Sequence, residues 1–371
     1  MPPTLISTTR QAPKHDGITD QLRSAIARGK LKPGDRLPVR TELESQLKAS
    51  RMTVQKALDE LIRDGFVISK GKLGTFVSDT PPCLNHYGLV LPHSPTHPRW
   101  NGYYDALLLS LHELNEVLQS QIQIYYSVDL PTDENFLQLC QDVRARRLAG
   151  LMFAEGPVEL TGTDLIRHPT IPMVASMSGK RKHNALEQLV SSGLDVVSGY
   201  DLACKILKEQ GARRLGMIML TKAREIFDES IPQVIKANGF DYNPVFCQTT
   251  PMEHRDEASY VVRLMMSLPR DQRPDGLYIS DDNLVPAVCR GLLEAGIRVG
   301  KDLHVATHRN YPSQAQDMLP THDVIFDIRQ LLSISLKRLE AKRMGDPSMK
   351  PVKIKAIRAN EIQQIKQETL P

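Results

Sequence analysis

The chain has 371 residues, a formal net charge of +4 and 41% hydrophobic residues. This length leaves room for two or three domains with buried cores. No apolar run approaches the ~20 residues that span a bilayer, and the polar, proline-bearing start lacks the apolar core of a signal peptide. We therefore expect a cytoplasmic protein without a membrane-spanning segment.

Charge is distributed unevenly along the chain. Residues 1–80 contain 14 Lys and Arg against 9 Asp and Glu, whereas the remainder contains 33 against 34. The basic first segment favours a polyanionic partner, although its net charge of +5 would also fit an ordinary solvated surface. Five widely separated cysteines without a CxxC pair argue against a metal site or a disulfide framework, and we expect no metal and no cofactor.

The first eighty residues read as a small helical unit followed by a hairpin. Apolar spacing, glycine breaks and a Ser N-cap predict helices over residues 18–28, 40–47 and 51–61 and short strands over 66–69 and 75–78. Two helices joined by a short turn form a helix-turn-helix, and a hairpin with a basic, glycine-bounded tip forms a wing beside it. The sequence therefore predicts a winged helix-turn-helix DNA-binding domain over residues 15–79, after a disordered lead-in at 1–14.

Three ordered blocks of this segment, residues 26–38, 50–58 and 71–77, resemble the DNA-binding domain of GntR-family transcription regulators. In that family the Arg that follows the N-cap of the recognition helix reaches base edges, and the glycine wing enters or skirts the minor groove. The resemblance implies base readout by Arg51. It implies further DNA contacts by Arg40, Thr41, Ser50, Thr53, Gln55, Lys56, Lys70, Gly71, Lys72, Gly74 and Thr75.

Two positions depart from the family pattern. Arg40 lies one place earlier than its usual counterpart, and Gln55 stands where an Arg is common. The second difference predicts a shifted operator sequence. The alternative interpretation of the whole segment is a helix pair with solvated charges that contacts protein, in which a basic, glycine-flanked hairpin would have little to do.

After a proline-bearing linker at residues 80–85, the periodicity changes to strands that alternate with helices of ten or more residues. Strands are predicted at 87–91, 122–126, 150–154, 172–175, 215–220, 276–279 and 303–306, and helices at 103–118, 134–146, 194–210, 231–238, 258–266 and 283–295. Such alternation implies parallel sheets with helices on both faces. Two such sets within residues 86–371 predict two doubly wound α/β lobes rather than one sheet.

Several segments between residues 86 and 345 resemble the effector-binding domain of LacI-type regulators, which is shaped like a periplasmic sugar-binding protein. They are residues 87–92, 146–151, 207–216, 274–282 and 291–303. A GntR-like head on a LacI-like body is similar to the arabinose-type repressors. The resemblance implies a homodimeric repressor that binds double-stranded operator DNA and is controlled by a small molecule, a sugar or related polar metabolite, between its lobes.

The resemblance also indicates which residues would contact that molecule. Asp282 matches an Asp that binds ligand hydroxyls, and Trp100 lies in a loop where the family places an aromatic ring against the ligand. The family's Arg clamp after the strand ending near residue 220 is missing, so we expect either that Arg224 or Arg309 replaces it or that the effector is not a common monosaccharide. The remaining candidates are His97, Arg99, Asp228 and Asp327. Asp282 could instead cap the following helix, and Trp100 could pack within its lobe.

Enzyme motifs are absent from the sequence. It contains no GxSxG, GxxxxGK[ST], GxGxxG or HExxH pattern, and its histidines are scattered. We therefore expect no enzyme. The alternatives are an enzyme body, for instance of the aminotransferase type, fused to a DNA-binding head, and a DNA-architectural protein that takes no ligand.

Overall fold

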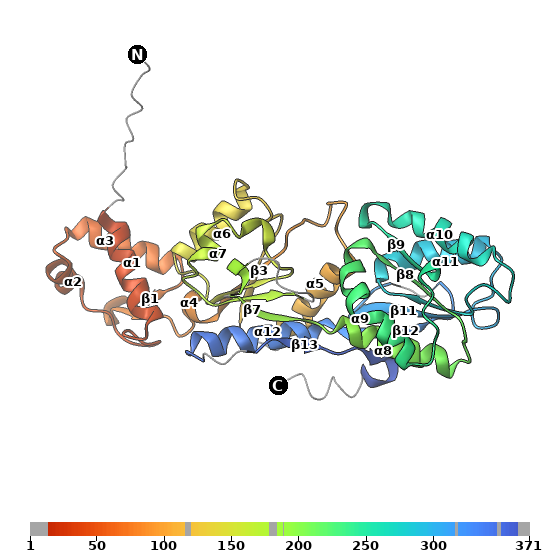
Figure 1. Cartoon of the computed structure of the whole chain (residues 1–371). Coiled ribbons are helices and arrows are strands. Elements are labelled where there is room, and N and C mark those ends of the chain that lie inside the picture. Colours follow the sequence, from red (N-terminus) through yellow and green to blue (C-terminus); the bar gives the residue numbers. More distant parts are fainter. Residues whose placement is uncertain are drawn as a thin grey trace, which may run out of the picture.

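The computed structural model describes residues 14–115, 120–177, 184–187, 189–315, 318–346 and 350–362. In Figure 1 a small N-terminal domain, here called the head, is followed by two α/β lobes, lobe 1 in the middle and lobe 2 at the far end. The predicted lead-in falls on residues outside this description, except that the first helix already begins at Lys14. No helix in the described ranges is long and apolar enough to cross a membrane.

The head consists of three helices and a two-stranded hairpin. They are α1 (Lys14–Ala27), α2 (Arg40–Leu47), α3 (Arg51–Arg63), β1 (Val67–Ser69) and β2 (Thr75–Val77). The helices and hairpin enclose an apolar core that includes Ile26, Leu61 and Phe66. The antiparallel hairpin turns through a short 3-10 segment, where Gly71 and Gly74 adopt positive φ values. These elements confirm the predicted winged helix-turn-helix.

The residues predicted as a linker form a short helix, α4 (Pro82–Asn85), that packs onto the head. Pro81 and Pro82 suit its first turn because proline presets the helical φ angle and needs no amide donor there. Pro82 and Cys83 are buried, and Cys83 belongs to the apolar core of the head. The chain thus leaves the head core directly before the first strand of lobe 1.

Lobe 1 contains a six-stranded parallel sheet in the order β13-β7-β6-β5-β3-β4. Its strands are β3 (His86–Val90), β4 (Gln121–Tyr125), β5 (Gly150–Phe153), β6 (Met173–Ser176), β7 (Val190–Leu194) and β13 (Val352–Ile354). Helices α5 (Gly102–Asn115) and α12 (Ile328–Arg343) share one apolar core with the sheet, whereas α6 (Glu134–Arg144) and α7 (Asp164–Arg167) belong to another. The two cores correspond to the two faces of a doubly wound sheet.

Lobe 2 repeats this plan with the sheet order β14-β12-β11-β10-β8-β9, in which only the short β14 runs antiparallel. Its strands are β8 (Leu215–Leu220), β9 (Cys247–Thr250), β10 (Gly276–Ile279), β11 (His304–Tyr311), β12 (His322–Asp327) and β14 (Ile357–Arg358). One core includes residues of α8 (Val196–Glu209) and α9 (Arg224–Ala237), and the other includes α10 (Ala258–Met266) and α11 (Val285–Glu294). The predicted pair of doubly wound lobes is confirmed.

The chain passes between the lobes three times, after β7, after β12 and after β13. Each passage leaves the carboxyl end of a parallel strand. The carboxyl ends of both sheets therefore face the junction between the lobes, which is where open α/β sheets place their ligands.

Candidate DNA-binding face and interlobe site

The basic residues predicted to contact DNA lie on α2, on α3 and on the wing. The side chains of Arg40, Arg51, Lys56 and Lys72 are exposed, and no carboxylate in the described part of the chain pairs with them. Exposed cations without an internal partner are available for phosphates and base edges. The structure thus leaves these four side chains free at the surface of the helix-turn-helix and wing.

The polar residues of the recognition helix α3 are partly engaged with one another. The Ser50 hydroxyl accepts a hydrogen bond from the Thr53 backbone amide at 3.2 Å, as an N-cap does, and lies 2.8 Å from the Thr53 hydroxyl. The Gln55 side-chain amide donates to Asp59 at 2.6 Å. Its amide nitrogen is held in this way and its side-chain oxygen is buried, so Gln55 must change its side-chain conformation before it can contact a base.

One basic residue that the sequence did not single out lies beside the wing, in the connection between α1 and α2. Arg36 is exposed and pairs with Phe76 of β2 through a backbone bridge. Its guanidinium lies so close to Gly74 that a Cβ there would be 3.0 Å from Nε. Lys70 lies over the Phe76 ring with its ammonium 5.0 Å from the ring centre. Thr41 is exposed and Thr75 is half-buried. Arg36 thus extends the basic surface at the base of the wing.

The rear of the recognition helix is tied to lobe 1 by ion pairs. Asp64, the C-cap of α3, has a side chain only 6% exposed and pairs with Arg23 of α1. It also accepts from Nε of Arg147 at 3.1 Å and from its terminal nitrogen at 3.0 Å. Arg147, which precedes β5, bonds Asp142 at 3.0 Å, and Asp142 accepts from the Tyr125 hydroxyl at 2.8 Å. This set, the Asp64 tie, connects the head to the sheet of lobe 1.

Asp282 lies at the junction of the lobes, just after β10, as predicted. Its carboxylate accepts hydrogen bonds from the Asn310 side chain at 2.9 Å and the Asn310 backbone amide at 3.3 Å. Loss of water raises the pKa of Asp282, while the nearby His308 and the bonds from Asn310 act in the opposite direction. The helix-capping role considered for Asp282 belongs to Asp281, which accepts from the Asn283 backbone amide at 3.1 Å.

The two lobes touch at this cluster. The Gly102 backbone amide, at the start of α5 in lobe 1, donates to the Asn283 side chain at 3.0 Å. A Cβ at Gly102 would lie 2.9 Å from the Asp282 carboxylate, so only glycine allows this approach. At the rim, Arg99 pairs with Glu253 at 2.8 Å. The two walls of the interlobe site are therefore in contact in this structure.

One polar atom of the interlobe site has no partner among the described residues. Asn310 is 4% exposed, and its side-chain oxygen is buried without a hydrogen bond. A buried acceptor without a donor is costly, and such atoms mark places where a ligand or water donor binds. The Asn310 oxygen therefore stands next to the Asp282 carboxylate as a second hydrogen-bond acceptor.

Trp100 packs against aromatic residues of its own lobe. Its indole nitrogen donates to Asp105 at 2.8 Å, and its ring lies 5.1 Å from that of Tyr104 and 6.3 Å from that of Tyr126. In the same loop, His97 stacks on His93 with ring centres 4.2 Å apart. These contacts favour the packing role for Trp100. Its ring is half-buried and forms an aromatic cluster with Tyr104 and Tyr126.

The other predicted effector residues already have internal partners. Asp327 is 1% exposed, caps α12 and forms two bonds with the Arg329 guanidinium, at 2.7 and 2.9 Å. Arg224 pairs with Asp228 on α9, and Arg309 pairs with Asp323, each at 2.9 Å. No hydrogen bond or ion pair within the described ranges joins these pairs to Asp282. The structure thus groups Asp282 with Asn310, Asn283 and Gly102, residues that the sequence did not nominate.

Known protein families match both the head and the body of the chain. Residues 14–77 match the family described as bacterial regulatory proteins, gntR family, and residues 204–321 match the periplasmic binding protein-like domain. The mannosyl-D-glycerate transport/metabolism system repressor of Escherichia coli is 31% identical over 113 residues, 30% of this chain and 47% of its own. The arabinose metabolism transcriptional repressor of Halalkalibacterium halodurans is 35% identical over 75 residues, 20% of each chain. The chain thus spans less than half the length of these relatives.

Solved structures extend the likeness across the body as a matter of fold. A LacI-family regulatory protein from Chloroflexus aggregans has a TM-score of 0.59 at 14% identity, covering 74% of this chain and 97% of its own. A LacI-family transcriptional regulator from Lactobacillus casei with bound glucose has a TM-score of 0.50 at 18% identity, covering 74% and 99%. The chain therefore joins a DNA-binding domain of the gntR family to a two-lobed, periplasmic binding protein-like body with the fold of LacI-family regulators.

Proposed function

We propose that the protein is a transcriptional repressor whose operator binding is controlled by a small polar molecule held between the lobes. The observation that carries this proposal is the set of unpaired cations around Arg51, on a helix-turn-helix that is tied to a body with a polar interlobe site. Both relatives named above are described as repressors, which favours regulation over catalysis.

At the DNA, the recognition helix and the wing would have different tasks. Arg51 at the start of α3 can bond O6 and N7 of a guanine with its guanidinium fork, which selects sequence. Lys56 and Lys72 would neutralise phosphates, which sets affinity without selecting sequence. Arg36 at the base of the wing adds a further cation for the backbone.

At the interlobe site, the convergent acceptors favour a ligand rich in hydroxyl groups. The Asp282 carboxylate and the unpaired Asn310 oxygen can each accept hydroxyl hydrogens. The glucose held by the Lactobacillus casei regulator and the carbohydrate-related names of the two relatives support the same class, a sugar, sugar acid or polyol. Without a free Arg clamp beside Asp282, we place uncharged or weakly acidic ligands first.

Control of DNA binding would come from the relative position of the lobes. The contacts Gly102–Asn283 and Arg99–Glu253 hold the walls together in the arrangement described here. A ligand that prefers either the open or the closed arrangement shifts the population by its difference in affinity. The Asp64 tie makes the head follow lobe 1 during that shift.

A homodimer would give the head two half-sites to bind. On lobe 2, Tyr260 and Leu264 of α10 are 67% and 75% exposed, and Leu293 of the neighbouring α11 is 52% exposed. Arg263 of α10 pairs with Glu294 of α11, so these exposed apolar side chains lie on adjoining helices. Such a surface, the α10 stripe, is typical of protein interfaces. A two-fold dimer would match a pseudo-palindromic operator.

The full chain can test the proposal in two steps. Binding sites are first selected from random duplex DNA, and pentoses, hexoses, sugar acids, polyols and nucleosides are screened by thermal shift. Operator affinity is then measured with and without each ligand that binds. A ligand that changes operator affinity supports the proposal. A ligand that binds the body and leaves operator affinity unchanged would show that the two parts are uncoupled.

A further inference from the structure

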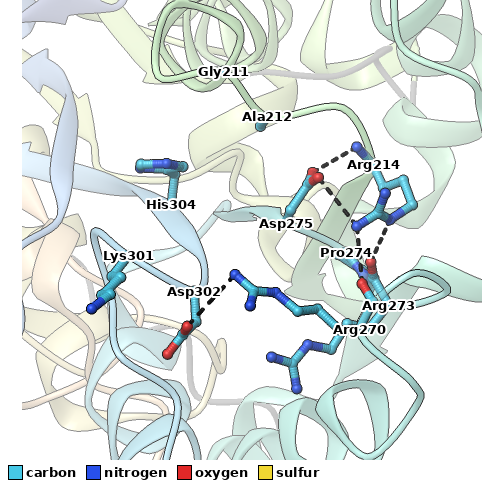
Figure 2. Close-up of a pocket in the computed structure, with 10 residues that line it drawn as sticks. All are labelled: Gly211, Ala212, Arg214, Arg270, Arg273, Pro274, Asp275, Lys301, Asp302 and His304. Atoms are coloured by element: carbon cyan, nitrogen blue, oxygen red, sulfur yellow. Dashed lines mark hydrogen bonds and ion pairs between the residues drawn. The ribbon is translucent and has the colours of Figure 1, made fainter.

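A polar pocket of about 160 Å³ lies in lobe 2 at the edge of the sheet opposite the interlobe site. Its walls are the three segments that lead into the amino ends of β8, β10 and β11 (Figure 2). The carboxyl ends of the same strands face the lobe junction, so the whole length of the sheet separates this pocket from Asp282. We call it the basic pocket, because Arg214, Arg270, Arg273, Lys301 and His304 line it.

Two acidic residues also line the basic pocket, and both are engaged by its walls. Asp275 accepts from the backbone amides of Arg213 and Arg214 at 2.8 and 2.7 Å and pairs with the Arg214 side chain at 3.2 Å. Asp302 bonds the Arg298 guanidinium at 2.7 and 2.9 Å. These bonds from Arg298 lower the pKa of Asp302 to about 2. Both carboxylates are therefore engaged by the pocket walls, and their one further ion pair with the remaining cations, among the described residues, is the long contact of Asp302 with Arg270 at 3.9 Å.

The remaining basic side chains lack a close acidic partner. The Arg273 guanidinium donates to the Met266 carbonyl at 3.1 Å, and Arg270, 76% exposed, comes no nearer than 3.9 Å to Asp302. The side chains of Lys301 and His304 have no hydrogen bond or ion pair within the described ranges. In Figure 2 Lys301 and His304 lie across the pocket from Arg270 and Arg273. The pocket therefore offers donors from two sides and few free acceptors.

We propose that the basic pocket binds a small phosphate-bearing anion, either inorganic phosphate or the phosphate group of an ester. Its volume is below the ~300–1,000 Å³ of pockets for drug-sized ligands, which favours a single acid group. Guanidinium forks from Arg270 and Arg273 match phosphate oxygens, and Lys301 adds a compact charge from the opposite wall.

DNA phosphate is a poor match for this pocket. Lobe 2 lies at the end of the molecule farthest from the head, with lobe 1 between them (Figure 1). DNA held by the same head therefore does not reach Arg270 or Lys301. The proposed anion site is thus separate both from the DNA-binding face and from the interlobe site, and it does not depend on the identity of the effector.

An anion in the basic pocket would brace two helices of lobe 2. Arg270 and Arg273 belong to the segment after α10, and Lys301 belongs to the segment after α11. Bridging these segments would fix the ends of both helices, and a ligand that binds only the folded state raises the free energy of unfolding by RT ln(1 + [L]/Kd). Phosphate above its Kd should therefore raise the melting temperature of the full chain by an amount that grows with the logarithm of its concentration.

The test compares the full chain with the variant R273Q/K301Q and with K236Q, which removes an exposed Lys from α9 of the same lobe. Inorganic phosphate and glucose 6-phosphate are titrated by calorimetry in phosphate-free buffer, against chloride at equal ionic strength. We expect saturable binding to the parent and to K236Q and a loss of about ten- to a hundredfold in R273Q/K301Q, as for lost charged hydrogen bonds. Circular dichroism checks that each variant is folded.

Two comparisons assign the source of the anion and its independence. Tighter binding of the ester than of inorganic phosphate would identify a phosphorylated metabolite, and the reverse would identify the free ion. Asp282→Ala should keep phosphate binding, which separates this site from the proposed effector site. Absence of saturable phosphate binding, or equal binding by R273Q/K301Q and the parent, would overturn the proposal. A loss of random-DNA affinity in R273Q/K301Q would instead identify a DNA backbone contact and also overturn it.

Discussion

The DNA-binding face of the head and the interlobe site differ in how their polar groups are satisfied. On the head, Arg51, Lys56 and Lys72 extend into solvent without an internal partner. Between the lobes, Asp282 is bonded to Asn310, and at the rim Arg99 is paired with Glu253. The cations of a DNA-binding surface can stay unpaired before DNA binds, because water solvates them. A cleft that closes must satisfy its own groups when its ligand is absent.

This difference determines what each ligand must displace. DNA replaces water and counterions on the head, so its affinity depends on salt. An effector bound at the proposed interlobe site would have to replace protein hydrogen bonds at Asp282 and Asn310, so its net affinity would be the difference between two bonded states. At the unpaired Asn310 oxygen, a ligand would gain a bond without breaking one.

The largest effect is expected on the buried side of the head. Asp64→Ala leaves Arg23, whose side chain is 4% exposed, without one of its two closest carboxylates, and it leaves Arg147 with Asp142 as its remaining acidic partner. We expect a loss of about 3 kcal/mol in the free energy of unfolding, as when one partner of a buried pair is removed. Urea unfolding of the full chain measures it, with Asp59→Ala on the exposed side of α3 as the control. Equal losses in both variants would show that the tie adds no stability.

A loss of effector affinity is expected next. Asp282→Ala removes a charged acceptor, so the ligand found by screening should bind more weakly by ~1.5–3 kcal/mol. Trp100→Ala separates the two roles of that ring. If the ring only packs against Tyr104, the melting temperature falls and calorimetry of the folded variant gives unchanged affinity. Undiminished binding to Asp282→Ala would place the effector elsewhere.

Specificity for the operator is expected to depend on Arg51. Arg51→Ala should reduce the preference for the selected site over random DNA by ~1–3 kcal/mol, because a bidentate contact to guanine is lost. Competition binding at fixed salt measures this preference. Gln46→Ala, on the neighbouring α2, serves as a variant without a predicted contact. Equal weakening on both DNAs would reduce Arg51 to a backbone contact.

Lys72→Ala should behave differently from Arg51→Ala. Loss of one phosphate contact weakens selected and random DNA equally and lowers the slope of log affinity against log salt by about 1. Fluorescence anisotropy over a salt series measures that slope. A change in sequence preference without a change in slope would mean that the wing tip reads bases.

The smallest effect is expected at the rim of the interlobe site. Arg99→Gln breaks an exposed ion pair with Glu253, and such pairs contribute little. We expect a change of less than about fivefold in effector affinity. Lys205→Gln, which breaks an exposed ion pair with Asp201 on α8 of lobe 2, is the matched control. A large change for Arg99→Gln alone would indicate that closure depends on the rim rather than on the Asp282 cluster.

The sequence predicts the head closely because its signals are local. The N-cap Ser50 and the break at Gly29 fix helix ends to within a few residues, and α2 has the predicted bounds. Strand β7 was missed because its small, polar residues do not resemble a buried strand. Packing requires them: the Ser192 hydroxyl lies 2.8 Å from that of Ser335 on α12, and a Cβ at Gly193 would lie 2.5 Å from the Met177 carbonyl.

The sites show the same limit. Asp282 was found through its family resemblance, but its partners Asn310 and Gly102 come from distant segments that no periodicity connects. The Asp64–Arg147 pair joins residues 83 positions apart in two domains, and no local sequence pattern around either residue predicts it. The sequence analysis did not predict β9, which is a short strand at the edge of its sheet. It also assigned no bounds to the elements that follow β11, among them β12 and α12. Contacts across domains need the fold before they can be read.

The Asp64 tie has a geometric consequence for any operator. A head held at Asp64 by lobe 1 does not swing freely on a flexible tether, so its recognition helix keeps a fixed bearing relative to that lobe. In the proposed homodimer, the gap between two recognition helices is then set by the contact between the two α10 stripes and by the angle between lobe 1 and lobe 2 in each copy. The spacing between half-sites that binds most tightly would therefore depend on that angle. Inserting or deleting single base pairs between half-sites would report, in steps of one base pair, which arrangement of the body the protein occupies.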